Sequence, residues 1–187
     1  MNGIMLEELV VQCGAPTLAG LKTGSLFVCP FESRETLFSE LRRINHGLSP
    51  CGLRIMPLRI GTERALLYLF RPARLEKDLQ CPCARKILLD AGYQDACIGK
   101  CMHCLIHRLQ GGEDFPHEIG LFLSYPPEDV QGFIENRAQN YKVIGIWKVY
   151  GDEEKARKTF AKYKKCTESY CRAFHAGKKM EQLAVAI

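Results

Sequence analysis

Two groups of residues have types and spacing that could support catalysis or metal binding: a Cys/His pair and a central set of cysteines. Cys13 precedes a predicted short helix that begins near Pro16. The exposed N–H groups and the dipole at a helix N-terminus stabilise a thiolate, so this position predicts a cysteine nucleophile with a lowered pKa. His117 is the candidate general base, and Glu118 is expected to orient it or to act as an acid itself.

Two further polar residues lie in the same segment as Cys13. Thr17 and Lys22 are candidate groups for binding an anion or an oxyanion. Together these residues predict a small cysteine-dependent enzyme that performs acyl, amide or sulfur transfer on a small-molecule or peptide substrate. A Cys/His pair is catalytic only when the two side chains meet in space, and the sequence does not show that they do. The alternative is that Cys13 packs beneath the first helix, while His117 and Glu118 make structural hydrogen bonds at a strand end.

The second group consists of Cys81, Cys83, Cys97, Cys101 and Cys104. The last three have the spacing with which radical S-adenosylmethionine enzymes hold a [4Fe–4S] cluster. Because thiolates select zinc or an iron–sulfur cluster, an alternative function is a noncatalytic, metal-binding redox accessory protein. On an unbroken helix, however, these three thiols form one stripe about 10 Å long. That stripe is too long for one small cluster and would make the cysteines packing residues.

The C-terminal fifth of the chain carries another cysteine pair and the excess of positive charge. Cys166 and Cys171 would share a disulfide or a metal if the chain breaks at residues 167–169, and would otherwise be packing residues. The net charge is +5, and residues 148–181 contain ten Lys or Arg against five Asp or Glu. This excess predicts a solvated helix face or, as a second alternative function, an interaction module with a basic C-terminal helical face. No recognition motif accompanies it, so nucleic-acid binding is not predicted.

The elements that must position these residues follow from apolar periodicity and turn residues. Helices are predicted at residues 4–12, 16–21, 34–45, 74–91, 94–109, from 127 onward, 153–165 and 168–176. Strands are predicted at residues 24–30, 53–60, 65–70, 119–125 and 143–150. Ser33 is the predicted N-cap of the third helix, Gly47 is its predicted end, and Trp147 is expected on a sheet face. The pattern predicts one α/β or α+β domain over residues 1–187, with a mixed sheet of four to five strands covered by helices.

Length and composition set the class of the protein. A chain of 187 residues can bury a core that needs neither disulfides nor metals. No apolar run approaches roughly 18 residues, so no membrane segment is predicted. The first nine residues contain acids where a signal peptide needs a basic region and a long apolar run. A cytoplasmic location is therefore expected, in which the ten cysteines stay reduced.

Three stretches carry a resemblance to a known family: residues 13–22 (CGAPTLAGLK), 115–126 (FPHEIGLFLSYP) and 145–151 (GIWKVYG). Together they resemble an uncharacterised bacterial family, domain-of-unknown-function family number 3793, which occurs mainly in anaerobes. The sequence departs from that pattern at Ser124, where Gly is expected, and at Val143, where many relatives have Cys. The resemblance implies a single domain and an intracellular location, and it implies no catalytic residues.

Overall fold

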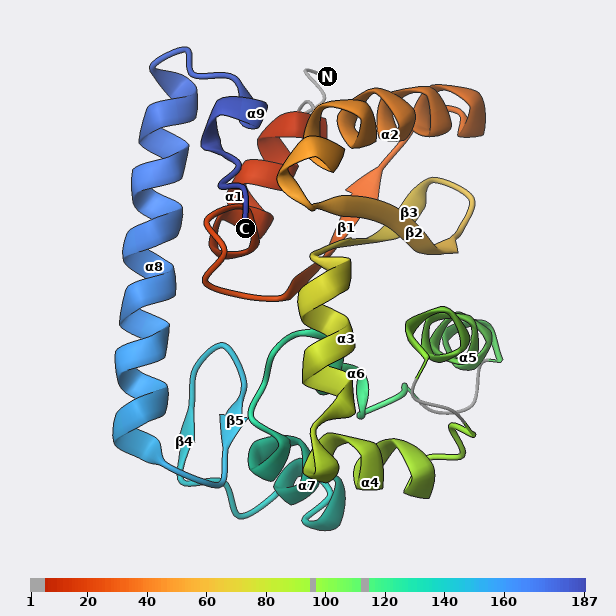
Figure 1. Cartoon of the computed structure of the whole chain (residues 1–187), viewed down its shortest axis with the longest axis vertical. Helices are drawn as coiled ribbons and strands as arrows, with labels where there is room; N and C mark the ends of the chain where they lie inside the picture. The colour runs from red at the N-terminus through yellow and green to blue at the C-terminus, as the bar shows by residue number, and fades with distance from the viewer. Residues whose placement is uncertain (1–5, 95–96, 112–114) are drawn as a thin grey trace. The chain divides into compact units, whose positions relative to one another are not determined.

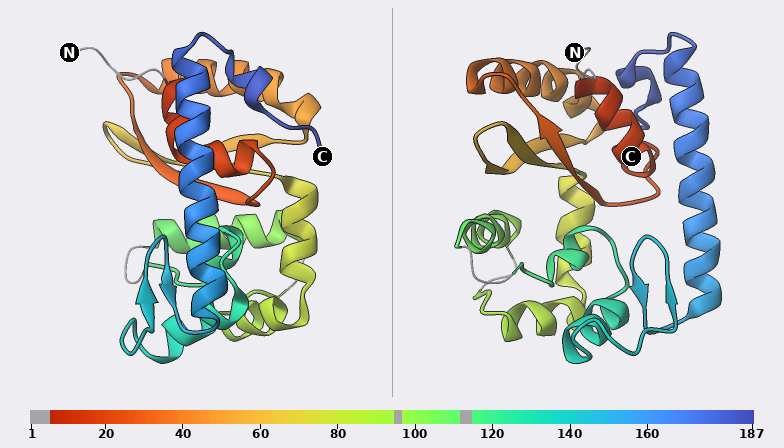
Figure 2. Two further views of the ribbon diagram at one scale, coloured as in Figure 1. Left: turned by 90° about the vertical axis from the view of Figure 1, so that its left-hand side faces the viewer. Right: turned by 180° about the vertical axis from the view of Figure 1, so that it is seen from behind.

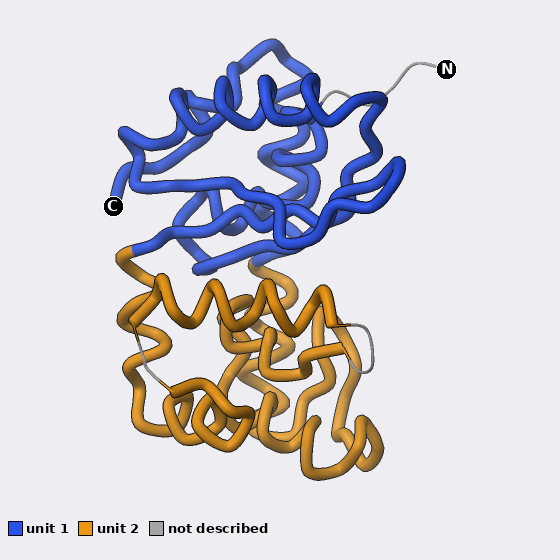
Figure 3. Tube along the Cα trace, turned by 90° about the vertical axis from the view of Figure 1, so that its right-hand side faces the viewer, with its two compact units in different colours: residues 1–72, 163–187 blue, residues 73–162 orange. Residues whose placement is uncertain are grey.

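The chain forms a mixed α/β structure that divides into two compact units (Figures 1 and 3). The computed structural model describes residues 6–94, 97–111 and 115–187. Unit 1 combines Met1–Pro72 with Tyr163–Ile187, and unit 2 consists of Ala73–Lys162. The strands are split between two sheets, so the expected single sheet of four to five strands is wrong. That residues 1–187 form one domain stays a prediction.

Unit 1 contains a three-stranded antiparallel sheet. Its strands are β1 (Gly24–Pro30), β2 (Arg54–Ile60) and β3 (Arg64–Phe70), in the order β1-β3-β2. These bounds confirm the three predicted strands to within one residue. Pro57 lies in β2, an edge strand, where a missing N–H donor is tolerated. The register between β2 and β3 shifts between Pro57 and Arg59.

One face of this sheet carries the apolar core of unit 1. Alternate residues of β3 (Ala65, Leu67 and Leu69) contribute to the core, because successive side chains of a strand point to opposite faces. Helices α1 (Leu6–Leu18), α2 (Arg34–Leu48) and α9 (Met180–Leu183) bury their apolar residues in the same core (Figure 2). Burial of this apolar surface is the main stabilising contribution to the unit.

Helix α1 is continuous through Pro16, so the prediction of two short helices is wrong. A proline inside a helix costs about 3 kcal/mol, and tertiary packing offsets that cost. Ala15 and Leu18 have no exposed surface. Gly14 lets α1 approach β3 closely, since a Cβ atom there would lie 2.5 Å from Cδ2 of Leu69.

The start of α2 confirms the predicted N-cap. Oγ of Ser33 accepts a hydrogen bond of 3.1 Å from the backbone N–H of Thr36, which satisfies one free donor of the first turn. The helix continues through Gly47, its predicted end, to Leu48. A short 3-10 helix, η1 (Ser49–Cys51), follows and leads to β2.

Unit 2 is mainly helical. Its elements are α3 (Pro72–Gln80), α4 (Pro82–Asp90), α5 (Ile98–Gln110), α6 (Ile119–Phe122), α7 (Pro127–Glu135) and the antiparallel hairpin of β4 (Val143–Ile144) and β5 (Lys148–Val149). Helix α8 (Glu153–His175) begins in unit 2, and its residues from Tyr163 onward belong to unit 1. Because α8 is continuous, the predicted break at residues 167–169 is wrong.

Three further predictions for unit 2 are wrong. Residues 119–125 form the short helix α6 and a turn, because all four residues of α6 are buried and a short apolar run looks alike in a strand and in a buried helix. Residues 143–150 form a hairpin, since the chain reverses direction within them. The helix predicted over residues 74–91 is interrupted at Cys81, where Pro82 opens α4.

Two predicted helices extend beyond the part of the chain that the structure describes. The helix at residues 4–12 includes residues 4–5, and the helix at residues 94–109 includes residues 95–96, all of which lie outside the described residues. Within the described ranges, none of the helices combines the length and the apolar character that crossing a membrane requires.

Candidate functional site

Cys13 lies inside α1, well beyond its start at Leu6, so the dipole at the N-terminus of its own helix does not reach it. Burial raises the pKa of the Cys13 thiol, and the nearby Cys171 raises it further. The thiolate is therefore scarcer at neutral pH than in a cysteine with the ordinary pKa, and the reason for expecting a lowered pKa is wrong. Cys13 belongs to unit 1 and His117 to unit 2, and their pairing stays a prediction.

Thr17 and Lys22 are both buried in unit 1. The hydroxyl groups of Thr17 and Ser25 share a hydrogen bond of 2.9 Å. Burial lowers the pKa of Lys22 from 10.5 to about 8, because desolvation disfavours the charged amine. Anion binding by these two residues stays a prediction, and their burial favours a structural role.

His117 and Glu118 are neighbours in sequence but have different surroundings. Glu118 is buried, accepts a hydrogen bond of 3.0 Å from the hydroxyl of Tyr93, and pairs with Nε of Arg108 at 2.7 Å. The ring of His117 lies 5.0 Å from the ring of Phe133, in an edge-to-face arrangement. Glu118 is thus held by Tyr93 and Arg108, while His117 is left at the surface.

The central cysteines start or occupy helices α4 and α5. Cys81 and Cys97 are N-cap residues, Cys83 is exposed in α4, and Cys101 and Cys104 lie along α5. Among the described residues, no three His, Cys, Asp or Glu side chains are grouped so that they could hold a metal ion. Cys101 and Cys104 lie along α5 as a helical stripe requires, and a zinc site or an iron–sulfur cluster at the central cysteines stays a prediction.

The remaining cysteine pair does not form a disulfide, since all ten cysteines are free thiols. Cys166 and Cys171 lie five residues apart on the unbroken α8, which places them on different faces of the helix. Cys171 packs against the core of unit 1. Cys171 therefore fits the packing role that the sequence left open.

Cys104 lines one cavity of unit 2, of about 500 Å³, on the exposed side of α5. The other residues that line it are Gly92, Tyr93, Gln94, Lys100, His103 and His107. Burial raises the pKa of the Cys104 thiol, Arg108 lowers it, and Glu118 raises it. A raised pKa makes this thiol a poor nucleophile at neutral pH.

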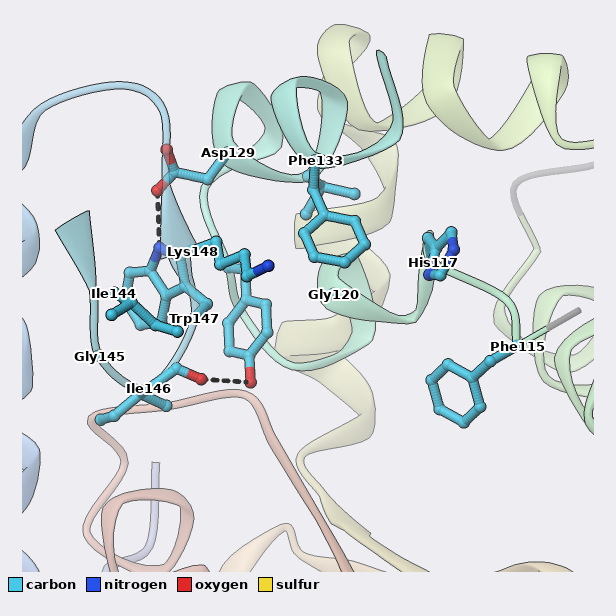
Figure 4. A pocket seen from close by; sticks show the side chains of 12 residues that line it. Phe115, His117, Gly120, Asp129, Phe133, Ile144, Gly145, Ile146, Trp147 and Lys148 are labelled. Carbon is cyan, nitrogen blue, oxygen red and sulfur yellow. Dashed lines mark hydrogen bonds between the residues drawn. The ribbon is translucent and has the colours of Figure 1, made fainter. Parts of the chain in front are cut away.

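A different cavity of unit 2, of about 410 Å³, combines apolar walls with a few polar groups, and we call it the unit 2 pocket (Figure 4). It is lined by Phe115, His117, Gly120, Tyr125, Asp129, Val130, Phe133, Ile144, Gly145, Ile146, Trp147 and Lys148. These residues come from the segment before α6, from α6, from the segment between α6 and α7, from α7, and from the β4–β5 hairpin. Its size and mainly apolar lining are typical of small-molecule sites.

Asp129 fixes the hairpin to α7 at one side of the unit 2 pocket. One carboxylate oxygen accepts a hydrogen bond of 2.7 Å from Nε1 of Trp147. The other accepts hydrogen bonds of 2.7 Å from the backbone N–H groups of Tyr150 and Gly151. Asp129 is only 3% exposed, and these three donors replace its hydration.

Aromatic rings hold Trp147 in place from two sides. Tyr125 stacks on Trp147 with ring centroids 4.8 Å apart, and its hydroxyl donates a hydrogen bond of 3.4 Å to the carbonyl oxygen of Ile146. Phe160 meets Trp147 edge-on at 4.5 Å. Gly145 is needed beside Phe160, because a Cβ atom there would lie 2.3 Å from Cε2 of that ring.

Lys148 is the cationic residue of the pocket lining. Its Nζ donates a hydrogen bond of 2.8 Å to the carbonyl oxygen of Ala138. It also lies 4.8 Å from the ring centroid of Tyr141 and 5.8 Å from that of Phe133, within the range of cation–π attraction. The polar groups of the pocket thus lie beside aromatic faces.

Residue type and spacing point to His117 but not to Trp147 and Asp129, which line the same pocket. Trp147 and Asp129 are separated by 17 residues, and no spacing rule links them. Trp147 was expected on a sheet face because residues 143–150 alternate like one strand, whereas the hairpin places it at the pocket. One sequence signal points to these residues. The stretches at residues 115–126 and 145–151, which carry the family resemblance, both contribute to the lining of this cavity.

One comparison with known proteins gives a match. The family model described as "Protein of unknown function (DUF3793)" matches residues 9–184, which is nearly the whole chain. No curated protein and no solved structure matches the sequence. The comparisons therefore assign no role to any residue, and the chemistry of the unit 2 pocket has to be judged from its geometry.

Proposed function

Because the chain belongs to the family described as "Protein of unknown function (DUF3793)", which carries no stated activity, we propose a function from the geometry alone. The unit 2 pocket binds a small ligand whose body is planar and largely apolar. The observation that carries this proposal is the aromatic lining of the cavity, made by Phe115, Tyr125, Phe133 and Trp147.

The exposure of apolar side chains at the unit 2 pocket supports ligand binding rather than core packing. Phe115 is 53% exposed and Ile146 is 44% exposed, although both line the cavity. Large apolar groups that stay exposed around a concave site are typical of ligand-binding surfaces. An apolar ligand would remove this surface from water and gain roughly 25 cal/mol for each Å² buried.

The support behind the aromatic residues is the second argument for binding. The hydrogen bond between Trp147 and Asp129 is buried, and Tyr125 stacks on the same indole. Rings held in this way lose little conformational freedom when a ligand arrives, which lowers the cost of binding. Offset stacking on fixed rings favours a planar partner.

Trp147 makes the proposal directly testable, because it is the single tryptophan of the chain and lines the unit 2 pocket. We expect titration with biphenylethanol, a neutral aromatic probe with two flat rings, to change the tryptophan fluorescence in a saturable way. Isothermal titration calorimetry should give the same dissociation constant. The absence of saturable binding in both measurements would refute the proposal.

A matched pair of variants places the binding in the pocket. Phe115→Ala removes an exposed ring from the lining, and we expect it to weaken probe binding several-fold with little loss of stability. Phe38→Ala removes a ring that is 40% exposed in α2 of unit 1, outside the pocket lining. This control should bind the probe like the wild type, and an equal loss in both variants would contradict binding at the pocket.

A further inference from the structure

Three residues that line the unit 2 pocket carry an imidazole, a carboxylate or an amine and have distinct surroundings: His117, Asp129 and Lys148. The carboxylate of Asp129 is buried and already accepts three hydrogen bonds. It is therefore committed to the fold, and its negative charge is compensated by those donors. His117 and Lys148 are the other two of these residues, and both carry N–H donors.

Lys148 keeps donor capacity that the described part of the protein does not use. An ammonium group has three N–H donors, and one of them is given to the carbonyl oxygen of Ala138. Its other contacts within the described residues are the faces of Tyr141 and Phe133, and no described carboxylate pairs with it. Aromatic faces attract a cation much less strongly than a carboxylate does.

His117 lies beside the same ring as Lys148. Nζ of Lys148 is 5.8 Å from the ring centroid of Phe133, and the ring of His117 is 5.0 Å from it. Figure 4 shows both side chains around Phe133. An imidazole ring carries an N–H donor in either neutral tautomer, so this part of the pocket presents donors from two residues around one apolar ring.

We infer that the natural ligand of the unit 2 pocket is an aromatic carboxylate, whose ring lies among the aromatic side chains and whose carboxylate binds Lys148, with His117 as a second donor. This inference rests on the proposed function, because it specifies the ligand of the same pocket. The lining offers one cation and one imidazole, which suits a single negative charge. A cationic ligand would be repelled by Lys148 and is therefore disfavoured.

Three probes with the same two rings separate the contribution of charge from that of apolar binding. Biphenylacetate carries a carboxylate, biphenylethanol is neutral, and biphenylethylamine is a cation. We expect biphenylacetate to bind about tenfold more tightly than the alcohol, the gain expected from a charge-assisted hydrogen bond. The amine should bind more weakly than the alcohol. Calorimetry and Trp147 fluorescence measure all three affinities.

Variants of two lysines assign the selectivity to one residue. Lys148→Met should abolish the preference for biphenylacetate while keeping the affinity for biphenylethanol within about twofold, because methionine preserves apolar contact. Lys148→Arg should restore the preference. Lys142→Met is the matched control, since Lys142 also donates to a backbone carbonyl, that of Gly151 at 2.7 Å, but does not line the pocket. It should keep the tenfold preference.

The outcomes distinguish the two proposals. If biphenylethanol binds the wild type as tightly as biphenylacetate, the carboxylate inference is wrong and ligand binding stands. If none of the three probes binds, both proposals are wrong. If Lys148→Met does not fold, the probe series with the wild type and Lys148→Arg still decides, because a carboxylate preference in both supports the inference and its absence in both refutes it.

Discussion

The fold buries the ionisable groups of Asp129 and Lys22 in different ways. Three hydrogen bonds to the carboxylate of Asp129 compensate for its lost hydration. For Lys22, burial lowers the pKa to about 8, which means that the charged amine is disfavoured in the folded state. The stability of unit 1 therefore depends on pH through Lys22.

The pH dependence that Lys22 causes has a definite sign. The unfolded chain keeps the ordinary pKa of 10.5, so between about pH 8 and pH 10.5 it binds more protons than the folded chain. The free energy of unfolding therefore rises with pH in this window. We compare the free energy of unfolding of Lys22→Met with that of the wild type. We expect the variant's value minus the wild-type value to be about 2 to 3 kcal/mol smaller at about pH 10.5 than at about pH 7. Urea unfolding followed by circular dichroism measures this change.

The control for Lys22→Met is the same substitution at an exposed lysine. Lys86 lies on the exposed side of α4, so Lys86→Met removes an exposed charge, whereas Lys22→Met removes a buried one. It gives the reference for the general effect of net charge on stability. If the free energy of unfolding changes with pH in the same way in both variants, the burial of Lys22 does not influence the pH dependence of stability.

At the scale of elements, the β4–β5 hairpin depends on one close approach. A Cβ atom at Gly145 would overlap the ring of Phe160, which also contacts Trp147. We expect Gly145→Ala to destabilise unit 2 by about 1 to 3 kcal/mol, the usual cost of inserting a methyl group into a packed site. Denaturant unfolding followed by Trp147 fluorescence measures the loss.

Gly99→Ala is the matched control for Gly145→Ala. It lies in α5, and a Cβ atom there meets nothing within 4 Å. Gly99→Ala should stabilise the protein by about 0.5 to 1 kcal/mol, because alanine favours a helix. A Gly145→Ala protein that is as stable as the wild type would mean that Phe160 moves aside without cost.

Elements with strong local patterns were predictable from the sequence. The strands β1, β2 and β3 are short runs rich in apolar residues that are bounded by glycine, proline or charged residues, and Ser33 supplies a specific cap for α2. Elements decided by tertiary packing were not predictable. Packing of Gly14 against Leu69 keeps α1 intact through Pro16, and complete burial removes any periodicity from α6.

The candidate site was predictable in part, for a similar reason. A histidine at residue 117 is a recognisable chemical group, and the pocket contains it. Its surroundings depend on a turn at residues 145–147 that brings Trp147 to Asp129, and a local pattern cannot predict that contact. The expected link from His117 to Glu118 stays a prediction, and the contacts of Glu118 with Tyr93 and Arg108 could not be read from the sequence.

At the scale of the whole molecule, unit 1 is assembled from two distant parts of the chain. The backbone N–H of Val185 donates to the carbonyl oxygen of Leu18 at 2.9 Å. The carbonyl oxygen of Val185 accepts a hydrogen bond of 2.7 Å from the buried Arg71, which also donates to Leu18 and Thr17. The C-terminal segment is therefore part of the structure that surrounds Arg71.

Removal of residues 184–187 should therefore destabilise unit 1. We expect a loss of about 1 to 3 kcal/mol, because the truncation removes an acceptor of a buried guanidinium group. Thermal unfolding and hydrogen exchange in α1 measure it. Val185→Ala is the matched control, since it keeps both backbone hydrogen bonds and changes a side chain that is 45% exposed. Equal stability of the two proteins would show that these hydrogen bonds contribute nothing.

The proline in β2 also affects how copies of the molecule behave toward one another. An exposed sheet edge can pair with a strand of another chain and start aggregation. Pro57 offers no N–H at that edge, and the nearby register shift disturbs the regular ladder. A second molecule therefore finds no continuous row of donors and acceptors on β2, which disfavours intermolecular pairing at this edge of the three-stranded sheet at high concentration.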